Sequence, residues 1–330
     1  MTTASLRVAL SRWENGHVVP DEVHSRLLCH VLELDEIGIQ PAPSLFDSTG
    51  DDSLFALLSA QTNNLRLLDR RVGAPAVRVQ TAGHVEALEA LWRGVDGADR
   101  VSIARVQADA AALAAWQDLD MGDHINASRH YVVARQAASR AGDPVLMAHA
   151  IGEHAIMLAE TGRAAAAAVE VARAEAMPML PMLLRSWLAA TYAQVSSGLP
   201  DQARSVQTAL IRAEAHLRRS THGDEAEMPY LALNEVHLRR WQGHILVRSG
   251  DPAGASATRA ALNELPGEFV RARCGQLLDL AEANLAGGDL EETHDLLDTA
   301  AATIARLGSV RLGNRHELLS RRLRSGVAGN

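Results

Sequence analysis

Apolar side chains recur at helical spacing over most of this 330-residue chain. From Ser53 to Arg324 a period of three to four residues continues with short breaks at Gly, Pro, Asn and Asp. This spacing predicts amphipathic helices, each with one apolar face. Runs of β-branched residues, which favour strands, are scarce. The pattern therefore predicts an all-α fold.

The first 36 residues predict two short helices of their own. Leu6, Leu10 and Trp13 share one face of the first helix, and Gly16 ends it. Pro20 begins the second helix, whose apolar stripe contains Leu27, Leu28, Val31 and Leu32. Residues 37–52 are rich in Pro, Gly, Asp and Ser, which predicts a linker. We therefore divide the chain into residues 1–36, 37–52 and a helical domain at 53–330.

Five similar blocks recur in the helical domain, and each opens on a Gly that we expect to end one helix. They read GDHINASRHYVVA, GRAAAAAVEVARA, GLPDQARSVQTAL, GDPAGASATRAAL and GDLEETHDLLDTA, starting at Gly122, Gly162, Gly198, Gly250 and Gly288. Five residues later stands a small residue: Ala127, Ala167, Ala203, Ala255 or Thr293. Twelve residues later stands Ala134, Ala174, Leu210, Leu262 or Ala300. Gly tolerates the left-handed helix end, and the small residue lets the two helices approach closely.

These blocks resemble the tetratricopeptide repeat, in which helical hairpins stack into an α-solenoid. Trp187 stands eleven residues before Gly198, as the signature Trp of that motif does, and Gly243 matches its helix-A glycine. The spacings between block glycines are 40, 36, 52 and 38 residues, longer than the nominal ~34. We expect residues 218–229 to form a loop within the longest spacing. An irregular Ala-rich helix bundle is the alternative.

The two ends of the helical domain carry no block. Residues 54–73 and 84–95 predict further helices that begin the solenoid. Residues 314–324 predict a last helix that is Arg-rich on its outer face, and we expect it to be a polar cap.

Composition narrows the class of protein further. Hydrophobic residues make up 47% of the chain but aromatic residues only 3%, and Ala and Leu, which favour helices, dominate. The net charge of −8 argues against a polyanion-binding surface over the whole protein, although a small DNA-reading module fits within it. Cys29 and Cys274 match no CxxC pattern, and no signal peptide or run of ~18 apolar residues is present. These features predict a cytoplasmic protein that does not interact with membranes.

The stretch SRWENGHVVP, followed by RLLCHVLEL, resembles the helix-turn-helix of the XRE family, from helix 3 onward. The resemblance implies that helix 3 lies in the major groove of operator DNA. It implies that Arg7 and Val8 reach base edges and that Arg12 reads guanine or grips the backbone. Ser11 shares the exposed face of that helix, and Asn15 and His17 would contact phosphate. Leu10, Trp13, Leu28 and Leu32 would form the core of the module.

Helices 1 and 2 of that module have no counterpart in the sequence. Without them Leu10, Trp13 and Leu28 would be exposed, and burying each is worth roughly 1.5–3 kcal/mol. Two alternatives follow: the true gene product starts upstream of Met1, or the module is a vestige that docks elsewhere. DNA binding is expected only in the first case.

An XRE-type reader followed by tetratricopeptide-like repeats resembles a class of bacterial transcriptional regulators. The resemblance implies a homodimer whose repeats bind a peptide or small effector and thereby alter DNA affinity. We place the effector on the inner helix of each hairpin, where Arg, His and aromatic groups suit an extended peptide. The candidate groove residues are Trp116, His149, Arg185, Tyr192, His237, Arg240, His244 and Glu282.

Catalysis is not expected. His149 and Glu153 stand four apart beside His154, but the HExxH order is absent, and no GxSxG, Walker or strand-borne GxGxxG motif occurs. The sequence also gives no reason to expect a cofactor or a metal. The competing hypothesis is a DNA-independent scaffold that binds a protein or peptide partner.

Overall fold

The computed structural model describes residues 10, 13, 20–32 and 52–328, and it divides the chain into two units. We call Met1–Leu54 the N-terminal unit and Phe55–Asn330 the helical unit. Each unit is described by itself. In the described residues every regular element is a helix, which confirms the predicted all-α class.

The described part of the N-terminal unit centres on helix α2 (Glu22–Leu32). Asp21 caps this helix, since its Oδ1 accepts hydrogen bonds from the His24 backbone N at 2.9 Å and from His24 Nδ1 at 2.7 Å. The Trp13 ring lies 5.1 Å from the His24 ring, centroid to centroid. Leu10, Trp13 and Leu28, which we expected in a core, are partly buried. The apolar stripe of α2 contains exposed residues, with Val31 70% exposed.

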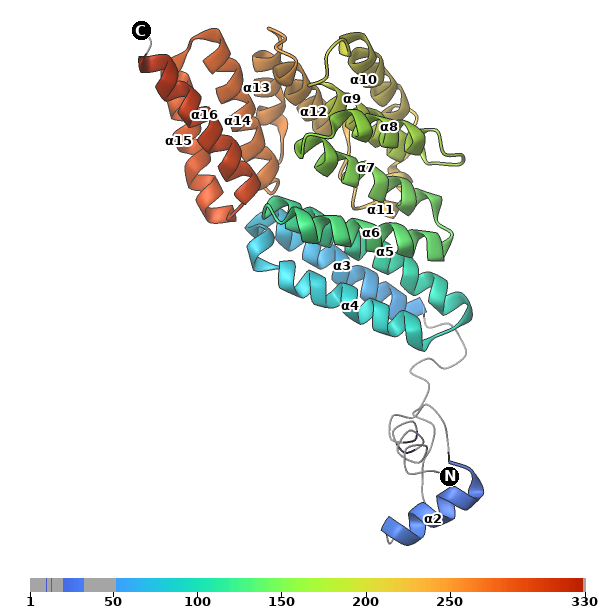
Figure 1. The fold of residues 1–330 in the computed structure, drawn as a ribbon. Coiled ribbons are helices and arrows are strands. Elements are labelled where there is room, and N and C mark those ends of the chain that lie inside the picture. Colours follow the sequence, from blue (N-terminus) through green and yellow to red (C-terminus); the bar gives the residue numbers. More distant parts are fainter. Residues whose placement is uncertain (1–9, 11–12, 14–19, 33–51, 329–330) are drawn as a thin grey trace. The chain divides into compact units, whose positions relative to one another are not determined.

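The helical unit consists of antiparallel helix pairs in succession, as an α-solenoid does (Figure 1). It opens with α3 (Asp52–Val72), a short 3₁₀ helix (Ala74–Ala76) and α4 (Arg78–Gly94). The pairs that follow are α5 (Gly97–Asp120) with α6 (His124–Ala141), α7 (Pro144–Glu160) with α8 (Ala164–Glu175), α9 (Met182–Ser196) with α10 (Ala203–Leu217), α12 (Glu235–Arg248) with α13 (Gly254–Glu264), and α14 (Val270–Gly287) with α15 (Leu290–Leu307). Helix α11 (His222–Glu227) lies in the predicted 218–229 loop, and α16 (Val310–Ala328) comes last.

All five block glycines lie in the turn between the two helices of a pair, as the sequence predicted. Four of them, Gly122, Gly162, Gly250 and Gly288, have positive φ. Gly198 does not, and in its turn Asp201 takes the left-handed conformation. The Asp after two of the glycines, Asp123 and Asp289, caps the next helix; Asp123 Oδ1, for example, accepts from the Asn126 backbone N at 3.1 Å.

The predicted packing positions are correct in three blocks and shifted by one residue in two. Thr293, Ala127 and Ala167 are fully buried where we expected close helix approach. Ala203 is exposed and Ala255 only partly buried, whereas Gly254, Ala209 and Ala261 are buried. The reason is the turn: α10 and α13 begin five and four residues after their glycine, whereas α6 begins two residues after it. The later start rotates each helix and brings the neighbouring position inward.

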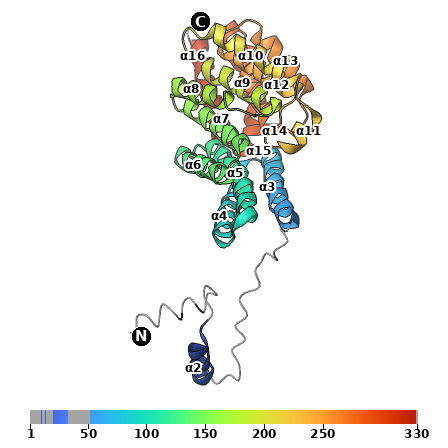
Figure 2. The same cartoon turned by 90° about the vertical axis from the view of Figure 1, so that its right-hand side faces the viewer.

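The first helices of the pairs, with α16, form a closed ring. Helix α5 packs against α7, α7 against α9, α9 against α12, α12 against α14, α14 against α16, and α16 against α5. We call these six the inner helices. The C-terminal helices therefore return to the start of the repeats (Figure 1; Figure 2). Helix α16, the expected polar cap, has exposed Arg residues at 321, 322 and 324, and it also joins both ends of the helical unit.

Close contacts hold the first and last helices of the helical unit together. A Cβ placed on Gly73 would lie 2.2 Å from the Leu307 carbonyl oxygen, so the turn after α3 touches the end of α15. Ser309 donates a 2.8 Å hydrogen bond to Asp120 Oδ1 on α5. Arg271 on α14 bonds Asp69 on α3 at 2.7 Å and lies 3.1 Å from Asp120. We call Asp69, Asp120, Arg271 and Ser309 the clasp.

No helix in the described residues is both long and apolar enough to cross a membrane.

Candidate functional site

The ring surrounds a cavity of about 680 Å³. Side chains from α3, all six inner helices and the segment after α11 line it. Its volume falls within the range of small-molecule sites, roughly 300–1,000 Å³. Because the inner helices close on themselves, the site is a chamber rather than the open concave groove expected from the repeats.

Aromatic side chains are concentrated in this cavity. The chain has five Trp, three Tyr and three Phe, and the cavity is lined by Trp116, Trp187, Trp241, Tyr230 and Phe269. The rings of Trp187 and Trp241 lie 6.1 Å apart. In a chain so poor in aromatic residues, this grouping provides an apolar wall suited to a ring or a hydrocarbon.

His149 lies within this wall without a hydrogen bond. Its ring is 4.4 Å from Tyr230 and 5.3 Å from Trp187, and the residue is 2% exposed. Neither ring nitrogen has a hydrogen-bond partner among the described residues. Oε1 of Glu153 lies 3.5 Å from Nε2, too far for a well-formed bond, and Oε2 of Glu153 is also buried and unpartnered. A ligand would satisfy these atoms, because buried polar groups are normally hydrogen-bonded.

A second part of the cavity carries positive charge without a matching carboxylate. Arg240 is half-buried, its Nε is buried without a hydrogen-bond partner, and no carboxylate of the described residues forms an ion pair with it, although the charge of Asp279 acts on it. Burial lowers its pKa to about 10, so it stays charged at neutral pH. Arg70 donates to the Pro229 carbonyl at 3.0 Å and lies over the Phe269 ring. Burial, with the charges of Arg240 and Arg70, lowers the pKa of His237 to about 4.

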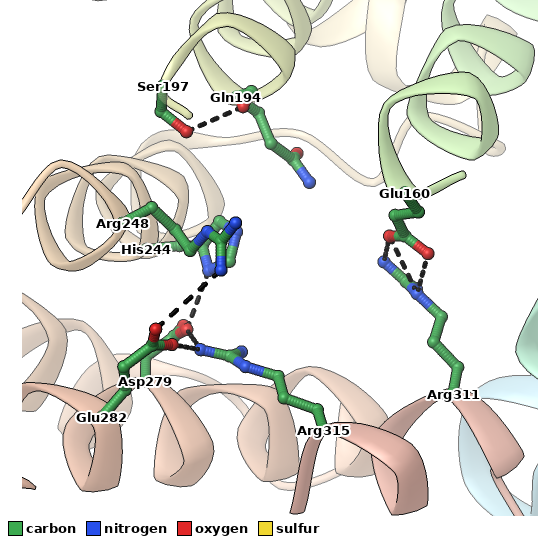
Figure 3. Close-up of polar contacts among 9 residues, drawn as sticks. All are labelled: Glu160, Gln194, Ser197, His244, Arg248, Asp279, Glu282, Arg311 and Arg315. Carbon is green, nitrogen blue, oxygen red and sulfur yellow. Dashed lines mark hydrogen bonds and ion pairs between the residues drawn. The ribbon is translucent and has the colours of Figure 1, made fainter. Parts of the chain in front are cut away.

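Charges in a third part of the cavity are paired (Figure 3). Asp279 Oδ1 lies 2.8 Å from His244 Nδ1 and 2.6 Å from Arg315 Nη2, and Arg315 also bonds Glu282 at 2.7 Å. Arg311 forms an ion pair with Glu160 on the facing helix α7. Burial alone would raise the pKa of Asp279, but His244 and Arg315 outweigh it and hold this pKa well below its ordinary range.

The Asp279 carboxylate should make the free energy of unfolding depend on pH. The pKa of Asp279 is lower in the folded protein than in the unfolded chain, where it is near 3.8. Its ionised carboxylate therefore stabilises the folded state fully at pH values above 3.8, and this stabilisation is lost as the pH falls further. We expect Asp279→Asn to lower the free energy of unfolding by about 2 kcal/mol at pH 5. The gap between the two proteins should narrow from pH 4 to pH 3. Urea unfolding at each pH measures it, and a gap that stays constant would show that this pKa is not depressed.

Five of the eight predicted groove residues line the cavity: Trp116, His149, His237, Arg240 and His244. Arg185 and Tyr192 instead line a separate pocket of about 580 Å³ formed by α8, α9 and α10. Arg185 has a structural task there, since it donates to the carbonyls of Glu175, Met177 and Leu180. Glu282 is not in the cavity wall but bonds Arg315, which is.

Sequence reasoning missed the cavity residues that lie outside the recognised repeats. Arg70 on α3, Tyr230 after α11, and Arg311 and Arg315 on α16 all line the cavity. Arg70 lies in a helix that we expected to begin the solenoid and Arg315 in the expected cap, whereas Tyr230 and Arg311 lie just outside the expected loop and cap. A period of four in Arg311 and Arg315 was the available signal, since it places both side chains on one face of α16.

In the described residues no group of three or more His, Cys, Asp or Glu side chains is arranged to hold a metal ion. The predicted DNA-contacting residues Arg7, Val8, Ser11, Arg12, Asn15 and His17 lie outside the described residues. No family model matches this chain, and no curated protein or solved structure matches it either.

Proposed function

We propose that this protein is a DNA-binding transcriptional regulator whose helical unit senses an effector inside the ring cavity. The observation that carries the sensing part is the chamber itself, which combines a half-buried Arg240 that forms no ion pair among the described residues with a buried His149 whose ring nitrogens have no hydrogen-bond partner. Such groups are costly in an empty protein and become favourable when a ligand pairs with them.

A relationship of the repeats to tetratricopeptide hairpins is part of this proposal. A Cβ on Gly243 would lie 2.7 Å from Thr258 Oγ1 and 2.9 Å from Thr258 Cα, so α12 and α13 can approach this closely only with Gly at that position. Trp187 occupies the inner face of α9 and reaches the cavity. Both features match the residues on which the resemblance rests.

The DNA-binding part rests on the sequence pattern around Trp13. A net charge of −8 makes the protein as a whole unsuited to DNA, so binding would be confined to the N-terminal module. A homodimer would present two such modules to a two-fold operator.

Operator binding gives the test. With a longer chain in which helices 1 and 2 complete the module, and selected genomic fragments, we expect Arg7→Ala to relax operator specificity and Asn15→Ala to weaken binding to every sequence. Fluorescence anisotropy on operator and scrambled duplexes at two salt concentrations measures both. Operator selectivity that is unchanged in Arg7→Ala would remove that helix from recognition. Failure of the wild type to bind any fragment would favour the DNA-independent scaffold.

A further inference from the structure

The geometry points to a compact aromatic acid as the effector. We infer that its oxyanion binds Arg240 and Arg70, its ring packs on Trp241 and Trp187, and a polar substituent hydrogen-bonds His149. This inference rests on the proposed sensing function and specifies the chemistry of the same cavity.

The charge pattern identifies the anion site. The cavity is lined by seven Arg and by five carboxylates, and Asp120 and Glu282 outside the lining also pair with Arg271 and Arg315. Most of these arginines are matched: Arg66 with Asp109, Arg271 with Asp69, Arg311 with Glu160 and Arg315 with Asp279. Arg248 lies 3.9 Å from Glu282.

Arg240 and Arg70 differ from the other five. In the part of the chain that the structure describes, neither forms an ion pair with a carboxylate. Burial and the charges of both arginines lower the pKa of His237 to about 4, so His237 is neutral at pH 7 and adds no third positive charge. A guanidinium without an ion-pair partner binds carboxylate or phosphate oxygens strongly, since charge-assisted hydrogen bonds are about twice as strong as neutral ones.

The aromatic wall begins directly beside this anion site. The Arg240 guanidinium carbon lies 5.8 Å from the centroid of Trp241, Trp241 lies 6.1 Å from Trp187, and Trp187 lies 5.3 Å from His149. The cation, the rings and the unpartnered imidazole therefore follow one another along the wall. A ligand that carries an acid at one end, a ring in the middle and a polar atom beyond it would satisfy all three.

The closed ring limits the length of the ligand. A chamber of about 680 Å³ has the size of an ordinary small-molecule site. It is bounded by α16 and the clasp, where an extended peptide in an open solenoid would continue along the groove. This geometry favours a compact acid over a long peptide.

Calorimetry and tryptophan fluorescence on the full chain, without DNA, test the inference. The probes are benzoate, phenylacetate, 3-phenylpropionate, indole-3-acetate and phenyl phosphate. Phenylacetamide lacks the charge, cyclohexylacetate lacks the aromatic ring, and a mixed hexapeptide pool represents longer ligands. We expect at least one aromatic acid to bind at or below about 1 mM and at least tenfold more tightly than its neutral or saturated counterpart. Phenyl phosphate as the best probe would identify phosphate as the source of the oxyanion, and a carboxylate as the best probe would identify a carboxylic acid.

Variants locate the binding. Arg240→Gln should weaken the best probe by roughly 10- to 100-fold. Arg259→Gln removes the same charge from an exposed pair with Glu292 and should leave affinity unchanged. His149→Phe keeps a ring in place but removes both nitrogens, so it should weaken binding without lowering the melting temperature.

Several results would overturn the inference. It is wrong if no aromatic acid binds at 10 mM, or if only the hexapeptides bind. It is also wrong if phenylacetamide or cyclohexylacetate binds as tightly as phenylacetate, or if Arg240→Gln binds the best probe as tightly as the wild type. Because no DNA is present, such a result leaves the operator assay intact. Conversely, aromatic-acid binding that does not alter DNA affinity would refute the proposed regulation and leave the ligand class standing.

Discussion

Arg271→Met is expected to lower the free energy of unfolding of the helical unit by about 3–5 kcal/mol. Arg271 lies between Asp69 and Asp120, whose side chains are 3% and 0% exposed, and its own side chain is 12% exposed. Removing the cation leaves two carboxylates buried without its charge. An isolated buried charge costs far more than the net gain from a satisfied pair. Urea unfolding followed by circular dichroism at 222 nm measures the loss.

The control is Arg259→Met, which breaks the ion pair with Glu292 between half-exposed side chains. Exposed pairs contribute roughly 0–1 kcal/mol, so this variant should remain close to wild type. Adding Asp69→Asn to Arg271→Met should recover part of the lost stability, since one of the stranded charges is then gone. Equal effects of the two Arg variants would show that the clasp does not hold the ring closed.

Gly73→Ala is expected to cost roughly 3 kcal/mol, from backbone strain together with overpacking. Gly73 has φ of +89°, and a Cβ there would lie 2.2 Å from the Leu307 carbonyl oxygen and 3.0 Å from its carbon. Both contacts are with backbone, which cannot rotate away as a side chain can. The turn after α3 must therefore move off the end of α15, and the closure opens. Thermal unfolding measures the loss, and the fluorescence of the cavity tryptophans reports the opening.

The matched control for this substitution is Gly287→Ala. Gly287 is the last residue of α14, without positive φ, and a Cβ there meets nothing within 4 Å. Ala at such a position should be neutral or stabilise by about 0.4–1 kcal/mol, because the unfolded chain loses freedom. If Gly73→Ala proves as mild as this control, the ends of the helical unit are not in the close contact described above.

The substitutions at Arg271 and Gly73 both test whether the ring of inner helices is closed. Arg271 holds the ring closed through its ion pairs with Asp69 and Asp120. Gly73 allows the ring to close because it has no side chain to collide with the backbone of Leu307. Gly73 does not line the cavity, so a change in ligand affinity in Gly73→Ala would link closure to binding, whereas Arg271 lines the cavity and its removal also changes the charge there. The proposed effector would then stabilise the closed ring by mass action, since it binds the folded chamber and not the unfolded chain.

The sequence by itself determined the local structure. Helical periodicity and the composition predicted an all-α chain, and the block glycines marked the turns within the pairs, because a left-handed helix end favours Gly wherever the chain must reverse. It also placed Trp116, His149, His237, Arg240 and His244 on inner faces, since a side chain's face follows from its distance to the turn. That rule failed in α10 and α13, where longer turns rotated the helix by one position.

Only the tertiary structure decided that the solenoid closes. The contacts that join Asp69 to Arg271, Asp120 to Ser309 and Gly73 to Leu307 span about two hundred residues each, and no local pattern encodes such a pairing. Each helix pair is rotated slightly relative to the pair before it, and the sum of these rotations decides whether the ring closes. The spacing of residues in the sequence does not determine these rotations. It made a chamber of the predicted groove, with the last helix as part of its wall, and it brought Arg70 and Tyr230 to the residues that the repeats had already placed there.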